Sequence, residues 1–280
     1  MIFVSGMPTF KKLASLKAYT GKTTTMDNIP KPTLGNINAI TIATPDPENS
    51  LVFYQKLGFK EVLRGDFPFI WIQVSDGQLL IMLRKAEERV ISLTYYVKDV
   101  EEKAAALEAE GIAFVIKPDP GDFIKRYVMR SPDGFNVTLV TLVENYMTAY
   151  NPVMLSMPPA DMMNPENYPN KICGLFGEYA QPVKDIDTSF AFWEKLGFKI
   201  LTKMSSPYPW AIISDGLSVV GLHQTSDFTD PTITFFAADM KDKIEQLQNN
   251  GITAYKEKGS GSVVLKTPEG QFINLFKMGM

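Results

Sequence analysis

The amino-acid sequence predicts an α+β protein of two tandem domains, each built from a pair of βαβββ modules. Three repeated observations lead to this prediction. They are a fixed spacing between an Asp and a Gly, a strand-like run before each Asp, and a tight-turn signal after each Gly. The repeat occurs four times along 280 residues, a length that is typical of about two domains.

The Asp-to-Gly spacing predicts four short helices. In each segment the Gly follows the Asp by twelve residues, and the pairs are Asp46 and Gly58, Asp99 and Gly111, Asp185 and Gly197, and Asp239 and Gly251. Apolar residues recur between them at helical spacing, as Leu51 and Tyr54 do in the first segment. Asp is a preferred N-cap residue and Gly commonly follows the last helical turn, so each segment predicts an amphipathic helix with one buried face.

Strand signals flank each predicted helix. Runs with apolar residues at alternate positions precede the four Asp residues, at 39–43, 92–97, 178–181 and 232–236. Further strands follow each Gly, with turn sequences at 75–77, 131–134, 214–216 and 267–270 that contain a Gly suited to positive φ. Each module is therefore expected to run as strand, helix and three strands.

The modules are related in pairs, because 53–59 matches 192–198 and the second module resembles the fourth. This order indicates that a two-module domain was duplicated whole. We expect an N-terminal arm at 1–34, domain 1 at 35–142 with modules 35–90 and 91–142, a Pro-, Met- and Asn-rich linker at 143–171, and domain 2 at 172–280 with modules 172–229 and 230–280.

The bulk composition excludes several classes of partner. The formal net charge is −3 without a run of Lys and Arg, which gives no footprint for a nucleic-acid backbone. No apolar run approaches the roughly 18 residues that a membrane span needs. The single cysteine, Cys173, cannot form an intramolecular disulfide. We expect a cytoplasmic protein, monomeric or homodimeric, whose partner is a small molecule and neither nucleic acid nor membrane.

The strand ending in Asp, the helix of residues 50–59 reading Ser-Leu-Val-Phe-Tyr-Gln-Lys-Leu-Gly-Phe, and the Pro-Asp-Gly turn before the last strand resemble one family. It is the vicinal oxygen chelate superfamily of glyoxalases, bleomycin-resistance proteins and extradiol dioxygenases, and the resemblance covers about 35–142 and 172–278. The resemblance implies that each domain forms a cupped mixed sheet with its helices on the convex side. It implies no single activity, because the superfamily includes isomerases, lyases, dioxygenases, transferases and non-catalytic drug binders.

The resemblance also implies metal ligands on the first and last strand of each module. The corresponding residues are Ala39, Ser92, Glu178 and Thr232 on first strands, and Met82, Thr138, Gly221 and Asn274 on last strands. Only Glu178 is a usual ligand, whereas a catalytic divalent site needs about three good donors. We therefore expect no metal or other cofactor, with a divalent metal left open for domain 2 alone.

The concave face of domain 2 carries the first candidate site. Strand alternation and the repeat alignment place Glu178, His223, Thr232 and Asn274 there, with Trp210 on or beside a neighbouring strand, and His223 is the only histidine in the chain. A hydrogen bond from Glu178 would orient the imidazole of His223 as a base or a ligand-anchoring group. Arg84 and Ser92 on the corresponding face of domain 1 are the second candidate.

These residues predict a small-molecule binding protein of the glyoxalase or bleomycin-resistance type, with the ligand in the concave cup of domain 2 and without the usual metal chemistry. The alternative is a glyoxalase-like lyase or isomerase, or a dioxygenase-related enzyme, with Glu178 and His223 as catalytic acid and base. If the protein is an enzyme, we favour the lyase or isomerase over the dioxygenase. A further alternative is that one of the two domains is only structural.

Overall fold

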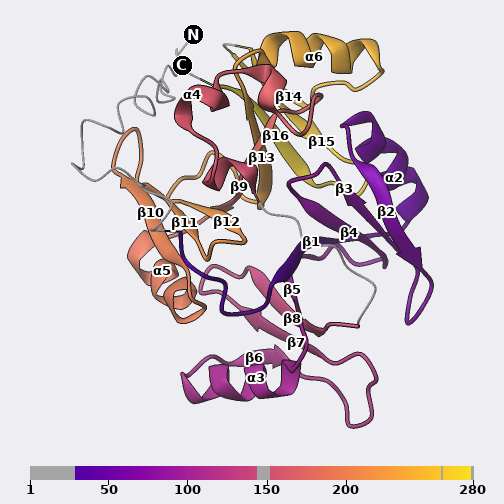
Figure 1. Ribbon diagram of the computed structural model, residues 1–280, viewed down its shortest axis with the longest axis vertical. Coiled ribbons are helices and arrows are strands. Elements are labelled where there is room, and N and C mark those ends of the chain that lie inside the picture. The colour runs from indigo at the N-terminus through magenta and orange to yellow at the C-terminus, as the bar shows by residue number, and fades with distance from the viewer. Residues whose placement is uncertain (1–28, 144–151, 260, 279–280) are drawn as a thin grey trace.

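The computed structural model describes residues 29–143, 152–259 and 261–278, which form two eight-stranded mixed sheets (Figure 1). The first sheet contains β1 (Ile37–Thr44), β2 (Lys60–Gly65), β3 (Trp71–Ser75), β4 (Leu80–Lys85), β5 (Ile91–Val97), β6 (Phe114–Ile116), β7 (Arg126–Arg130) and β8 (Asn136–Thr141). The second contains β9 (Leu175–Pro182), β10 (Lys199–Met204), β11 (Trp210–Ser214), β12 (Val219–His223), β13 (Thr232–Ala237), β14 (Lys256–Gly259), β15 (Ser262–Lys266) and β16 (Phe272–Lys277).

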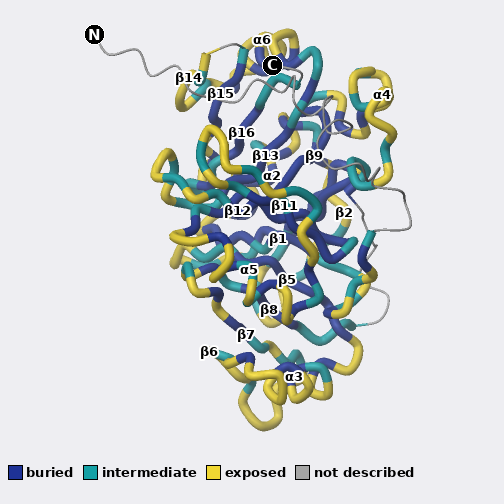
Figure 2. The backbone as a smooth tube through the Cα atoms, turned by 90° about the vertical axis from the view of Figure 1, so that its left-hand side faces the viewer, coloured by how far each residue is buried: buried dark blue, intermediate teal, exposed yellow. Residues whose placement is uncertain are grey.

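The two sheets have the same topology, which confirms the predicted α+β class and the repeated βαβββ module. The strand orders are β2-β3-β4-β1-β5-β8-β7-β6 and β10-β11-β12-β9-β13-β16-β15-β14. In each module the first strand pairs parallel with the last, and the two modules of a sheet join through the antiparallel pairs β1–β5 and β9–β13. The first strands therefore lie at the centre of each sheet, and Figure 2 shows them largely buried.

Each module has one helix between its first two strands: α2 (Pro47–Lys56), α3 (Val100–Ala109), α5 (Ile186–Lys195) and α6 (Met240–Asn249). The glycine after each helix has a φ between 76° and 88°, as the twelve-residue spacing predicts. None of the helices among the described residues is long and apolar enough to cross a membrane.

The predicted Asp cap is present on two helices and wrong for the other two. Asp46 accepts the backbone N–H of Asn49 at 3.1 Å, and Asp185 accepts that of Thr188 at 2.8 Å. Asp99 and Asp239 make no such bond, because their φ of −106° and −97° is less extended than the −134° and −150° of the two caps. The Asp239 carboxylate instead lies 3.3 Å from the ammonium of Lys243.

The helices bury their apolar faces in two cores that are shared between the domains. One core combines Leu51 and Tyr54 of α2 with Ile244 and Leu247 of α6. The other combines α3 with α5, and Trp193 of α5 is fully buried in it. The first module therefore packs against the fourth, and the second against the third, as the placement of α2 beside β15 and of α3 below α5 in Figure 1 indicates.

The Pro-acid-Gly turns of the second and fourth modules reach across this interface. Glu269 accepts hydrogen bonds from the hydroxyls of Ser50 at 2.9 Å and Tyr54 at 3.0 Å on α2. In the corresponding turn of the second module, Asp133 accepts hydrogen bonds from the backbone N–H of Lys184 at 2.9 Å and from the hydroxyl of Ser189 on α5. Each domain thus supplies a carboxylate that the helix of the other domain satisfies.

The turns of the first and third modules hold carboxylates that are more deeply buried. Asp215 accepts a hydrogen bond from Tyr95 of the other domain at 2.6 Å and from the backbone N–H groups of Leu217 and Ser218. Asp76 accepts one from Asn170 at 3.1 Å. Burial raises the pKa of both aspartates, and the hydrogen bonds oppose that rise.

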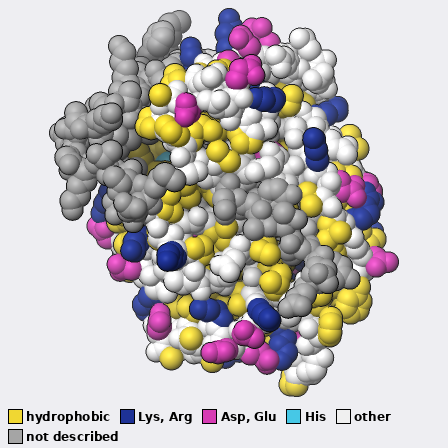
Figure 3. Space-filling model, in the orientation of Figure 1, with side chains coloured by type: hydrophobic (Ala, Val, Ile, Leu, Met, Phe, Trp, Pro, Cys, Tyr) yellow, Lys and Arg dark blue, Asp and Glu magenta, His cyan; other side chains and the backbone are white. Residues whose placement is uncertain are grey.

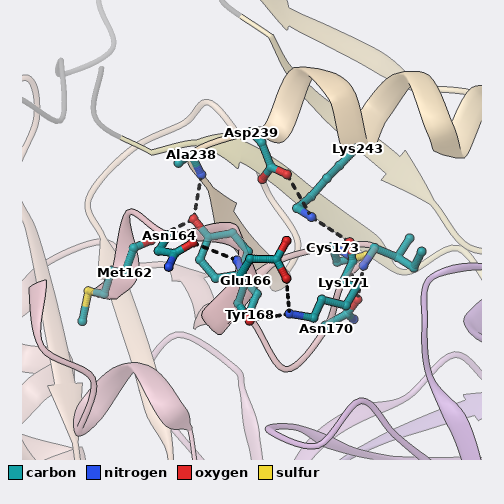
Figure 4. Close-up of polar contacts among 11 residues, drawn as sticks. Met162, Asn164, Glu166, Tyr168, Asn170, Lys171, Cys173, Ala238, Asp239 and Lys243 are labelled. Atoms are coloured by element: carbon teal, nitrogen blue, oxygen red, sulfur yellow. Dashed lines mark hydrogen bonds and ion pairs between the residues drawn. The ribbon is translucent and has the colours of Figure 1, made fainter. Parts of the chain in front are cut away.

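The described part of the predicted linker is packed against the start of α6 (Figure 4). It contains 3₁₀ turns at Val153–Leu155 and Pro165–Asn167 and the short helix α4 (Pro159–Met162). The Tyr168 hydroxyl donates to the Met162 carbonyl at 2.8 Å and accepts from the Ala238 N–H at 2.9 Å. The buried ammonium of Lys243 donates to the Lys171 carbonyl at 2.7 Å, so the segment is fixed by polar contacts on domain 2.

The interdomain bond between Tyr95 and Asp215 can be tested by its pH dependence. In Tyr95→Phe the buried carboxylate loses a donor, and we expect a loss of about 1–3 kcal/mol in the free energy of unfolding. Because that donor opposes the raised pKa of Asp215, the pKa of the folded variant rises further. The loss should be smallest near and below the unfolded-state pKa of about 3.9, where the carboxyl is protonated in both states, and grow as the pH rises through the folded-state value.

Urea unfolding between about pH 4 and pH 8 measures this difference, with Tyr255→Phe as control because Tyr255 is 59% exposed. A loss that is equal at every pH would contradict a coupling between Tyr95 and the ionisation of Asp215.

Candidate functional site

The face of each sheet opposite its helices carries the predicted site residues. On β1, Ile40 and Ile42 lie in the helix-side core, whereas Ala39 packs on the other side of the sheet with Leu80 and Tyr96. Residues directly opposite one another on neighbouring strands share a face. We define the Ala39 face of domain 1 by Ala39, Thr41, Arg84, Ser92, Thr94, Tyr96 and Thr138. We define the Glu178 face of domain 2 by Glu178, Ala180, His223, Thr232, Thr234 and Asn274.

Glu178 and His223 are in contact at the centre of the Glu178 face. The imidazole Nε2 lies 3.1 Å from Oε1 of Glu178, and the two side chains are only 12% and 9% exposed. The hydroxyl of Tyr208 lies 3.2 Å from the other ring nitrogen, Nδ1. Both nitrogens of the imidazole therefore have a partner, and the ring is held between a carboxylate and a phenol.

The second carboxylate oxygen of Glu178 has a different environment. Oε2 is buried and has no hydrogen-bond partner among the described residues. Buried polar atoms are rarely left unpaired, because an unpaired one forfeits its hydration without replacement. Oε2 is thus a buried acceptor whose hydrogen bond none of the described residues supplies.

Gly221 makes the space that the Glu178 carboxylate fills. A Cβ at this position would lie 1.9 Å from Oε2 of Glu178 and 2.6 Å from Nε2 of His223. Gly221 has no positive φ, so its backbone does not require glycine. The absence of a side chain at the aligned ligand position of β12 is therefore what allows the acid and the imidazole to meet.

Aromatic side chains surround the pair. The rings of Tyr208 and Phe228 have centroids 5.9 Å and 5.7 Å from that of His223. Trp210 is half-buried and directly opposite His223 on the neighbouring strand. Burial, with smaller contributions from Glu178 and Asp227, raises the pKa of Tyr208 to about 12, so its hydroxyl keeps its proton at neutral pH.

A hollow of about 280 Å³ lies next to these rings, between the two domains. Phe228 belongs to both the hollow and the surroundings of His223. The other residues that line it are Pro132, Asp133, Pro182, Val183, Lys184, Thr225, Ser226 and Thr229.

Thr232 and Asn274 form a second polar group on the Glu178 face. The amide of Asn274 donates to the hydroxyls of Thr232 at 3.0 Å and Thr234 at 3.3 Å. Thr234 lies directly opposite Glu178 in the β9–β13 pairing. The structure therefore brings Glu178, His223, Thr232, Asn274 and Trp210 to one region of domain 2, as the repeat alignment predicts.

The two remaining predicted residues lie on the other domain. Ser92 is buried and shares a 2.7 Å hydrogen bond with Thr138. Arg84 is half-buried, with its guanidinium carbon 5.1 Å from the ring centroid of Phe69. They belong to the Ala39 face and do not extend the Glu178 site.

Sequence reasoning misses Phe228 and the role of Gly221. Phe228 stands in the loop between β12 and β13, where no periodicity indicates which way a side chain points. The repeat alignment shows only that Gly221 stands at a ligand position of the family and cannot bind a metal. That Gly221 leaves room for the Glu178 carboxylate depends on side-chain packing, which the alignment does not show.

The residues present do not fit the catalytic metal that the superfamily resemblance implies. Within residues 29–143, 152–259 and 261–278, no three His, Cys, Asp or Glu side chains cluster so that they could hold a metal ion. The Glu178 face offers one carboxylate and one imidazole, fewer than the about three strong donors of such a site. The amide of Asn274 is engaged with two threonines, so it does not complete a donor set for a metal ion.

A methyl group at Gly221 should separate the pair. In Gly221→Ala we expect the Glu178 carboxylate to be displaced and the NMR resonances of the imidazole to shift, and these resonances are unambiguous because the chain has one histidine. Gly65→Ala is the matched control, since its Cβ would meet Trp71 of domain 1 at 2.6 Å. Unchanged imidazole resonances in Gly221→Ala would show that Glu178 and His223 do not interact in solution.

Comparisons with known proteins agree with this architecture. Residues 36–139 match the model of the Glyoxalase/Bleomycin resistance protein/Dioxygenase superfamily. No curated protein matches the chain. Among solved structures, the 2,3-dioxygenase LapB from Pseudomonas sp. KL28 has a TM-score of 0.55 at 15% identity, over 89% of this chain and 94% of that one. A variant of homoprotocatechuate 2,3-dioxygenase from B. fuscum has a TM-score of 0.58 at 13% identity, over 90% of this chain and 74% of that one.

Identities this low establish the fold and not the reaction. Together with the four βαβββ modules, the matches show that residues 36–139 are similar to the Glyoxalase/Bleomycin resistance protein/Dioxygenase superfamily and that the whole chain has the vicinal oxygen chelate fold, in two tandem copies.

Proposed function

We propose that the protein binds a small organic molecule on the Glu178 face of domain 2 and that this binding needs no resident metal. The observation that carries the proposal is the buried Oε2 of Glu178, which has no partner among the described residues. An unsatisfied buried acceptor costs about 1–3 kcal/mol, and more when it is charged. A ligand with an N–H or O–H group would satisfy it.

The surroundings indicate the kind of ligand. Tyr208 and Phe228 flank the imidazole of His223, and aromatic rings of this kind favour stacking or edge contacts with a flat molecule. We therefore propose a planar ligand that places a hydrogen-bond donor on Glu178. The superfamily includes non-catalytic drug binders, and a face with one carboxylate acceptor and several aromatic rings suits a protein of that class.

The arrangement favours binding over catalysis by His223. Both ring nitrogens have partners, Glu178 and Tyr208, so the imidazole could accept a substrate proton only after one of them moved. In the alternative enzyme, a glyoxalase-like lyase or isomerase, the available base would be Oε2 of Glu178, with His223 positioning the carboxylate.

For location we propose the reducing cytoplasm, in which the buried free thiol of Cys173 stays reduced.

A thermal-shift screen with a small-molecule library tests the proposal. A ligand present at 100 times its Kd should stabilise the wild type by about 2.7 kcal/mol. We expect Glu178→Gln to weaken the ligand about tenfold or more, because the amide can present a donor where the carboxylate accepts. His223→Ala should also weaken it, whereas the matched control Glu194→Gln, an exposed carboxylate on α5, should not.

Full affinity in both site variants would place the ligand elsewhere and refute the proposal. Elemental analysis that found a stoichiometric metal, lost in Glu178→Gln, would refute binding without a metal. Conversion of the ligand by the wild type, detected by mass spectrometry and abolished in Glu178→Gln, would establish the enzyme in place of the binding protein.

A further inference from the structure

We propose that domain 1 has a second, separate site on its Ala39 face, where Arg84 binds a small oxyanion such as a carboxylate or a phosphate. The internal duplication gives Arg84 a counterpart in domain 2, which is His223. Arg84 and His223 each lie on the last strand of a module, two residues beyond the aligned positions Met82 and Gly221. Each also lies directly opposite a tryptophan, Trp71 for Arg84 and Trp210 for His223.

The loop before that tryptophan places an aromatic ring on the basic side chain in both domains. Phe69 lies over the Arg84 guanidinium at 5.1 Å, and Tyr208 lies beside the imidazole of His223 at 5.9 Å between ring centroids. A basic side chain next to an aromatic ring is therefore common to both faces. In domain 1 this side chain is Arg84, and in domain 2 it is His223.

The carboxylate is the part that domain 1 lacks. Ala39 stands where domain 2 has Glu178, and Met82 stands where it has Gly221. The Met82 sulfur accepts a hydrogen bond from Tyr96 at 3.4 Å. Among the described residues Arg84 forms no ion pair, although it is half-buried. A partly buried guanidinium without a carboxylate is a group that an external anion would stabilise.

A second arginine strengthens the positive field of this face. Arg126 is opposite Val140 on β8, and Val140 is opposite Tyr96, so Arg126 lies on the same side of the sheet as Arg84. Burial and then the charge of Arg126 lower the pKa of Arg84, while Glu88 acts in the opposite direction. Two guanidinium groups that repel one another form a typical environment for an oxyanion, since each has several N–H donors.

Hydroxyl groups lie on the same face of the sheet as the arginines. The hydroxyls of Thr41 and Thr94 are 2.8 Å apart, and those of Ser92 and Thr138 are 2.7 Å apart. In such a pair only one proton lies between the two oxygens. The Ser92 hydroxyl also lies 3.2 Å from the Asn136 carbonyl, so the pair formed by Thr41 and Thr94 is the one from which a proton is left to donate. With Phe69 and Trp71 at the same end of the face, an anion attached to a ring would gain apolar contacts as well.

Titration calorimetry of the full chain at constant ionic strength tests this site, with inorganic phosphate, sulfate, acetate and benzoate as probes. We expect at least one of them to bind the wild type and to bind Arg84→Met about tenfold or more weakly. Preference for benzoate over acetate would identify an aromatic carboxylate, and preference for phosphate or sulfate would identify a phosphate-type ligand.

Arg64→Met is the matched control, because it removes the same charge from domain 1. Arg64 lies opposite the core residue Ile72 and pairs with Glu48 and Glu61 on the helix side of the sheet. The anion affinity of the Arg64→Met variant should equal that of the wild type. Equal affinity in Arg84→Met and Arg64→Met, or no binding of any of the four anions, would overturn the proposal.

A second variant guards against a folding defect in Arg84→Met. The double change Ala39→Glu with Met82→Gly recreates in domain 1 the carboxylate and the space that Glu178 and Gly221 provide in domain 2. It keeps Arg84 and should abolish anion binding by giving the guanidinium an internal partner. Unaltered anion affinity in a folded double variant would also overturn the proposal. The Glu178 site is not changed by these substitutions, so this test and that of the proposed function can fail independently.

Discussion

The hydrogen bonding of four carboxylates, two of them buried and two half-buried, at the contact between the two domains is the constraint on which the structure depends. Each βαβββ module ends with a tight turn before its last strand, and three of these turns carry Asp while the fourth carries Glu. Each of these carboxylates accepts a hydrogen bond from a residue of the other domain or of the linker. Asp133 accepts one from Ser189, for example, and Glu269 accepts one from Tyr54. A buried carboxylate without hydrogen-bond donors is strongly destabilising. The contact between the two domains is therefore stabilised by these hydrogen bonds as well as by the burial of apolar side chains.

This docking leaves the opposite faces of the sheets free to diverge. The helix-side cores must match between modules, whereas the Ala39 and Glu178 faces share no core with the other domain. The two faces retain an aligned basic residue, Arg84 or His223, but differ in the acid that would accompany it. On the side of the molecule that Figure 3 shows, Lys and Arg side chains are scattered among acidic ones.

Much of the fold follows from local rules that the sequence displays. The glycines after the helices and in the turns need positive φ, and those positions are recognisable without any tertiary knowledge. The meeting of Glu178 and His223 was also predictable, because the first and last strands of a module pair and a period of two keeps both residues on one face. What escapes prediction depends on contacts between distant segments. Asp99 and Asp239 look like caps but have a different backbone, Phe228 lies in an irregular loop, and no sequence pattern indicates that Glu269 would meet Tyr54.

The shared cores also change what the term domain means for this chain. The two halves that sequence similarity defines share their cores, since the helix side of the first module joins that of the fourth in one cluster and the second joins the third in another. A cut in the segment between β8 and β9 would leave two fragments, each with the part of its apolar surface that now meets the other domain uncovered. Such fragments are suited to reassemble by complementation and poorly suited to a separate existence, so the tandem arrangement acts as a covalent dimer whose second half is an obligatory partner of the first.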